Sequence, residues 1–80
     1  MEKKEILDKL DAIVATSVNH HDFLLDINTR PTDVQGWDSL ANAMIITAIQ
    51  NEFRIKLKFV ELVSWKTIGQ LVDIIENKMS

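Results

Sequence analysis

The sequence predicts a small all-α protein: a bundle of three main helices plus one short helix, with a long loop between the first two main helices. Three observations support this fold class. Apolar residues recur every three or four positions in three separate stretches, which is the pattern of amphipathic helices. A long stretch rich in turn-forming residues separates the first two of them. The only strand-like alternation is short and has no second strand to pair with.

Length and composition limit what the chain can do. With 80 residues, 46% of them hydrophobic, residues 1–80 are predicted to form a single domain around one small core. The absence of cysteine excludes disulfides and cysteine metal sites. No long apolar run follows Met1–Glu5, so we expect neither a signal peptide nor membrane insertion, and a cytoplasmic monomer. The net charge of −3 argues against nucleic-acid binding, which usually requires a basic face.

The first helix is predicted over residues 3–18, and the long loop over residues 19–37. The helix is amphipathic, and its apolar face is formed by Ile6, Leu7, Leu10, Ile13, Val14 and Val18. Loops as long as the one that follows are uncommon in compact domains and are often functional. We expect its apolar residues to hold it against the core: Phe23, Leu24, Leu25, Ile27 and Val34.

The second helix is predicted to begin at Asp38 or Ser39, either of which can cap it, and to end near Glu52. Its predicted apolar face comprises Leu40, Ala43, Ile45, Ile46 and Ile49, with Phe53 just beyond. The alternating segment Arg54–Phe59 is interpreted as an extended connection whose alternate side chains enter the core.

A short helical turn is predicted at residues 59–63, before the last helix. Ser64 or Thr67 is expected to cap that helix, which has an apolar face of Ile68, Leu71, Val72, Ile74, Ile75 and Met79. Gly69 in its first turn is expected to carry a modest local cost.

Ser39 is the side chain best placed for chemistry. It follows a loop and opens a helix, where free backbone N–H groups and the helix dipole favour a negative group such as a phosphodiester. An Asp-Ser pair is also an ordinary helix cap. The tripeptide Asp38-Ser39-Leu40 is therefore weak evidence alone, expected by chance in roughly a few per cent of chains this long.

The surroundings of Ser39 make the signal more specific. Asp33-Val34 and then Gly36-Trp37-Asp38-Ser39-Leu40 follow the amphipathic first helix and the loop, and the second helix ends in Glu52-Phe53-Arg54-Ile55. A last helical stretch then covers residues 67–75. In this order and spacing, and over nearly its whole length, the sequence resembles the acyl carrier protein family.

The resemblance implies a carrier that does no chemistry itself. A phosphopantetheinyl transferase would attach 4′-phosphopantetheine from coenzyme A to Ser39, and acyl-loading and acyl-transferring enzymes would be the other partners. The arm ends in a thiol that holds the cargo as a thioester, so the chain needs no cysteine of its own. Asp38 matches the acid that helps the transferase recognise the site. Leu40 matches the motif's hydrophobe, for which we expect packing and support of the turn.

The sequence departs from the carriers of fatty-acid synthesis, whose second helix tends to be strongly acidic. Here Glu52 is the only acid of that helix after Asp38, and the next segment is basic. We therefore expect a specialised pathway rather than housekeeping fatty-acid synthesis. The cargo stays open among a fatty acyl group, a polyketide unit and an amino acid.

Apolar contact is expected to contribute more to partner docking than in acidic carriers. Ala41 and Met44 are the candidates, although Met44 could equally be half-buried against the bundle. Trp37 could contact a partner or anchor the loop, and the anchoring role is favoured. For Trp65 the structural role is favoured more strongly.

Other functions account for the residues less well. An unmodified interaction module, binding through the second helix, is the main alternative. A serine hydrolase needs a base oriented toward its nucleophile, but the only histidines, His20 and His21, lie on the loop. Their adjacent positions also lack the spacing of a metal site. A DNA-binding helix-turn-helix is disfavoured because the helix opening at Ser39 contains no Lys or Arg.

Overall fold

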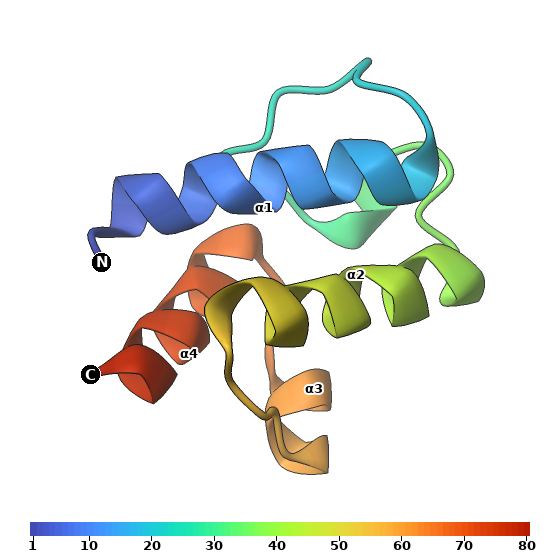
Figure 1. The fold of residues 1–80 in the computed structure, drawn as a ribbon. Coiled ribbons are helices and arrows are strands. Elements are labelled where there is room, and N and C mark those ends of the chain that lie inside the picture. Colours follow the sequence, from blue (N-terminus) through green and yellow to red (C-terminus); the bar gives the residue numbers. More distant parts are fainter.

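The computed structural model describes residues 1–80 and contains four α-helices and no strand (Figure 1). The helices are α1 (Lys3–Val18), α2 (Ser39–Phe53), α3 (Phe59–Ser64) and α4 (Ile68–Met79), with one 3-10 turn at Pro31–Asp33 inside the long loop. α1 packs against both α2 and α4, and the short α3 projects below α2 in Figure 1. The predicted bundle of three main helices plus one short helix is therefore confirmed.

One hydrophobic core joins the three main helices. It is made of side chains from α1, α2 and α4 together with two loop residues: Ile6, Leu10, Val14, Leu25, Val34, Ile45, Ile49, Phe53, Ile68, Leu71, Val72 and Ile75. α3 contributes no buried residue. The short helix is therefore a surface element attached to a core that the other three helices complete.

The buried face of α2 differs from the predicted one. The fully enclosed positions are Ala41, Ile45, Ile49 and Phe53, four residues apart, whereas Leu40 is 71% exposed. The expected packing role of Leu40 is therefore wrong. The expected partner contact at Ala41 is also wrong, because its side chain is only 4% exposed. Both errors arise because α2 is apolar on several faces, so periodicity alone does not choose which face points inward.

The long loop is held to the core at some of the predicted positions but not all. Leu25 and Val34 are buried and Phe23 packs against the core, whereas Leu24 and Ile27 are exposed. Backbone hydrogen bonds join the loop to the start of α4: Ile68 N donates to Thr29 O at 2.8 Å, and Gly69 N donates to Ile27 O at 2.9 Å.

Gly69 has a role that the sequence does not reveal. A Cβ added there would lie 2.9 Å from Ile27 O and 3.0 Å from Ile27 Cβ. Glycine therefore allows the loop to lie directly on the first turn of α4. This close contact explains why a glycine occupies a helical position.

The connection from α2 to α4 is partly as predicted. Arg54 ends α2 in the left-handed conformation, and Ile55 and Leu57 pack against the core. Phe59, expected to enter the core as well, is instead 77% exposed. Thr67 rather than Ser64 caps α4, since Thr67 Oγ1 accepts a hydrogen bond from Gln70 N at 3.3 Å.

Candidate functional site at the start of the second helix

Ser39 is the first residue of α2, and its side chain is exposed. Asp38 precedes it as the N-cap, and Asp38 Oδ1 accepts a hydrogen bond from Ala41 N at 2.8 Å. Of the two caps that the sequence allowed, the structure uses Asp38. The Ser39 hydroxyl is therefore not needed to complete the helix.

Backbone hydrogen bonds shape the part of the loop that leads to Ser39. The 3-10 turn closes as Asp33 N donates to Arg30 O at 2.8 Å and Val34 N donates to Pro31 O at 3.1 Å. Val34 is buried in the core, which fixes the loop there. Gly36 then bends the chain with a φ of +87°, a conformation that side chains with a Cβ rarely adopt. The bend leads directly into the cap of α2.

Two tryptophans lie close together beside this helix start. Trp37 packs against the core, and its Nε1 donates to Asn42 Oδ1 at 3.0 Å. Its ring centroid lies 6.1 Å from that of Trp65, which follows the last residue of α3. The Trp65 Nε1 atom is buried and has no hydrogen-bond partner. Trp37 therefore anchors the loop, as favoured from the sequence, and connects the start of α2 to the end of α3.

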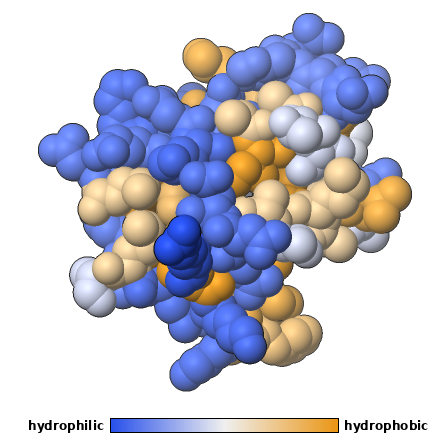
Figure 2. Space-filling view, viewed as in Figure 1, coloured by the Kyte–Doolittle hydropathy of each residue, from blue (hydrophilic) through white to orange (hydrophobic).

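The outward face of α2 carries no charged residue between its cap and its last turn. Its exposed side chains are Ser39, Leu40, Ala43, Met44, Thr47, Asn51 and Glu52. Met44 is 46% exposed and so remains available to a partner. Glu52 binds Lys9 of α1, with Oε2 2.9 Å from Nζ. Figure 2 shows hydrophobic and near-neutral atoms along this part of the molecule.

Leu40 is the residue of this face whose exposure sequence reasoning missed. A bulky apolar side chain directly after Ser39 resembles a packing residue in the sequence. In the structure it stands in solvent beside the candidate site.

The two histidines bind separate partners around the end of α1. His20 Nε2 lies 2.6 Å from Gln35 O, and this contact joins the segment directly after α1 to the loop just before the site. His21 Nε2 lies 2.8 Å from Asp11 Oδ2. No group of three or more His, Cys, Asp or Glu side chains is arranged to hold a metal ion. None of the helices combines the length and apolar character that crossing a bilayer requires.

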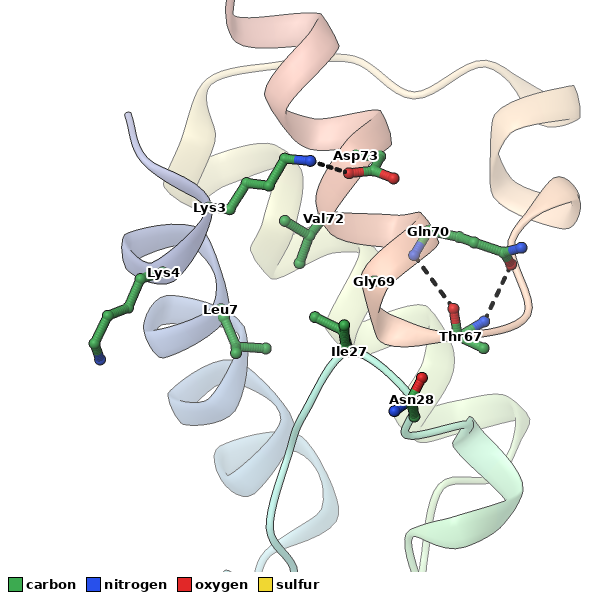
Figure 3. Close-up of a pocket in the computed structure, with 10 residues that line it drawn as sticks. All are labelled: Lys3, Lys4, Leu7, Ile27, Asn28, Thr67, Gly69, Gln70, Val72 and Asp73. Atoms are coloured by element: carbon green, nitrogen blue, oxygen red, sulfur yellow. Dashed lines mark hydrogen bonds and ion pairs between the residues drawn. The ribbon is translucent and has the colours of Figure 1, made fainter.

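The largest hollow, of about 520 Å³, is not at Ser39. Figure 3 shows it between the first turns of α1, the loop at Ile27 and the first turns of α4. Lys3 Nζ lies 2.9 Å from Asp73 Oδ1 at its edge, and this hydrogen bond and charge raise the pKa of Lys3. No residue between Val34 and Met44 lines the hollow, so it does not belong to the candidate site.

A family model described as "Phosphopantetheine attachment site" matches residues 8–75. The match covers most of the chain and includes the start of α2. The chain belongs to this family. Members of this type are carriers that hold phosphopantetheine covalently, and the resemblance drawn from the sequence is confirmed.

A solved structure agrees with the family assignment. The solution NMR structure of the holo acyl carrier protein from Geobacter metallireducens matches with a TM-score of 0.82 and 29% sequence identity. The match covers 91% of this chain and 84% of that one. No curated protein sequence matches the chain. The fold and family together show a carrier of the acyl carrier protein type, a type that is generally non-catalytic and works with modifying and biosynthetic enzymes.

Proposed function

We propose that Ser39 is the residue that bears the 4′-phosphopantetheine arm, added from coenzyme A by a phosphopantetheinyl transferase. One observation carries the assignment. Ser39 is exposed at the first position of α2, while the neighbouring Asp38 side chain caps the helix by accepting a hydrogen bond from Ala41 N. A modified Ser39 would therefore leave the cap intact.

The residues around Ser39 fit a phosphodiester. The N-terminus of α2 carries a partial positive charge that favours an anion, and no basic side chain is needed for this effect. In the transfer, the Ser39 oxygen forms a bond to the phosphorus of the pantetheine phosphate. The bond from that phosphorus to the adenosine bisphosphate portion of coenzyme A breaks, and the hydroxyl proton passes to a base of the transferase. When bound, the arm supplies the thiol that holds the cargo.

Asp38 has a second role in the proposal. Its Oδ1 is occupied by Ala41 N, but the side chain is exposed and Oδ2 remains available to the transferase. Leu40, exposed next to Ser39, offers the same enzyme an apolar contact.

The neutral face of α2 supports a specialised pathway rather than housekeeping fatty-acid synthesis. Its one acid beyond the cap, Glu52, is already paired with Lys9. An enzyme that recognises an acidic helix would find little to bind here. The enzymes that load and unload the arm are therefore proposed to recognise Leu40, Met44 and neighbouring apolar surface.

Co-expression with a phosphopantetheinyl transferase, followed by intact-mass measurement, tests the attachment. The wild-type chain should gain the mass of one phosphopantetheine group. Ser39→Ala should gain none, and the matched control Ser64→Ala should gain it as the wild type does. Circular dichroism should show Ser39→Ala to be as helical as the wild type. An unmodified wild-type chain after treatment with several active transferases would overturn the proposal.

A further inference from the structure

The basic side chains fall into two groups. Of the nine, five lie within 4.0 Å of a carboxylate: Lys3, Lys4, Lys9, Arg30 and Lys78. The other four take part in no ion pair and are exposed: Arg54, Lys56, Lys58 and Lys66. All four lie in the short segments directly before and after α3. In a chain of net charge −3, the free positive charge is thus gathered around one short helix.

α3 itself presents apolar side chains to solvent. Phe59 is 77% exposed, Val60 63% and Val63 62%. The single acid of α3, Glu61, is neutralised by Lys78, whose Nζ lies 2.9 Å from Glu61 Oε1. The three exposed apolar residues and the four free basic residues form what we call the α3 surface. Figure 2 shows hydrophobic atoms beside hydrophilic ones at this end of the molecule.

The α3 surface borders the start of α2. Trp65, which follows the last residue of α3, lies against Trp37, two residues before Ser39. At the other end of α2, Gln50 Oε1 accepts a hydrogen bond from Leu57 N at 3.0 Å, which fixes the basic segment to the last turn of the same helix. A molecule bound to the α3 surface would therefore lie beside the site where the arm is proposed to be attached.

We propose that the α3 surface docks the enzymes that act on the arm, and that their complementary face is an apolar depression with an acidic rim. The proposal rests on the proposed function of Ser39. A bulky aromatic side chain exposed among apolar neighbours is a typical anchor of a protein interface, and free charges around it steer an oppositely charged partner. Because the unpaired charges of the α3 surface are all positive, and α2 carries no charge between Asp38 and Glu52, the α3 surface fits an acidic partner and not a basic one.

An anionic membrane could also attract apolar and basic residues, but the dimensions of α3 disfavour it. Six residues make a helix roughly 9 Å long. Helices that hold proteins at a bilayer surface bury a much longer apolar face, often of several turns. Three exposed apolar residues are better suited to a single pocket on a protein.

The test compares acylation of holo-protein variants by an acyl-loading enzyme from the same genome, chosen because it acylates the wild type. Lys56→Gln/Lys58→Gln removes two charges from the α3 surface. Lys3→Gln/Lys4→Gln changes the net charge equally at the start of α1, releases no acid on α2, and serves as the matched control. We expect kcat/KM to fall about threefold to tenfold for the first variant only, with a weaker salt dependence.

A second pair of variants tests the apolar part. Phe59→Ala should lower kcat/KM at least as much, whereas Leu24→Ala, which removes an exposed apolar residue from the distant loop, should not. Wild-type rates for both α3 variants, or a faster rate for Lys56→Gln/Lys58→Gln, would overturn the docking proposal while leaving the arm on Ser39 intact. Absence of the arm in the wild type, seen by intact mass, would overturn the proposed function and this inference together.

Sedimentation with vesicles of phosphatidylcholine containing a quarter phosphatidylglycerol tests the alternative that the α3 surface binds an anionic membrane. We expect no binding. Binding by the wild type that Lys56→Gln/Lys58→Gln abolishes would assign the α3 surface to a membrane and overturn its assignment to an enzyme.

Discussion

Asp38 and Ser39 are adjacent and chemically similar as helix caps, yet the structure gives them different tasks. Asp38 Oδ1 binds Ala41 N and so completes the first turn of α2. Ser39 lies one position later, exposed and outside the cap. Modification of a capping side chain would weaken the helix it opens. The division of roles avoids that conflict.

This division predicts different stabilities for two alanine variants of the unmodified protein. Asp38→Ala should lower the free energy of unfolding by about 1 kcal/mol, because the Ala41 amide loses its partner. Ser39→Ala should change it by less than about 0.5 kcal/mol, as is usual for exposed positions without a partner. Urea denaturation followed by circular dichroism measures both. Equal losses in the two variants would show that Ser39 shares the cap.

The sequence was sufficient to identify Ser39 as the candidate site, but not to predict the burial of the two residues that follow it. The order of motifs pointed to Ser39. Leu40, however, was expected to pack and is exposed, and Ala41 was expected to contact a partner and is buried. One residue along a helix is a rotation of about 100°, and both side chains are apolar. Only the packing of α2 against α1 determines that Ala41 faces inward and Leu40 outward.

At the scale of elements, α4 depends on the loop that lies on its first turn. Gly69 N donates to Ile27 O, and a Cβ at residue 69 would approach that oxygen to 2.9 Å. Helix propensity alone would favour alanine at this position by about 1 kcal/mol. The close approach opposes that gain, since the obstructing atom belongs to the backbone and cannot rotate away.

Gly69→Ala is therefore predicted to destabilise the protein by about 1–3 kcal/mol, the usual cost of forcing an extra carbon into a packed contact. Asn77→Ala, an exposed position in the same helix, should be neutral or slightly stabilising. Thermal unfolding of the two variants beside the wild type measures the difference. A stabilised Gly69→Ala protein would mean that the loop does not press on α4.

The helices themselves were predicted well because their signals are local. Spacing and caps placed α1, α2 and α4 close to their observed bounds. The contact between Ile27 and Gly69 joins residues that are far apart in the chain, and no local pattern encodes it. The exposure of Phe59 was missed for the same reason, since an alternating segment does not reveal where the core ends.

At the scale of the whole molecule, ion pairs connect α4 to the helices around it. Lys3 of α1 binds Asp73 at 2.9 Å, and Lys78 binds Glu61 of α3 at 2.9 Å. The hydrogen bond from Lys78, with a further one from Lys58 N, holds the pKa of Glu61 below its ordinary value. The folded protein therefore binds a proton at Glu61 less readily than the unfolded chain does.

This lowered pKa gives a pH dependence of known sign. The stabilisation from Glu61 is complete above its ordinary pKa of 4.5 and is lost as the pH falls through the lower folded value. Glu61→Gln should therefore be less stable than the wild type at neutral pH, and the gap should close in acid. Lys78→Gln should show the same trend. Urea midpoints across a pH series measure it, and a gap that stays constant with pH would contradict the account.

We propose that the whole fold serves to present the Ser39 hydroxyl. The core of α1, α2 and α4 fixes the loop through Val34, the bend at Gly36 leads into the Asp38 cap, and Ser39 is left exposed. The chain has four serines: Ser17, Ser39, Ser64 and Ser80. Only Ser39 combines exposure with the start of a long helix after a fixed loop.

Fragment mass spectrometry of the protein after treatment with a phosphopantetheinyl transferase and coenzyme A tests this claim most directly. We predict that the added phosphopantetheine mass is found on Ser39 and on no other serine. A fully modified protein whose added mass lies on Ser17, Ser64 or Ser80 would contradict the assignment.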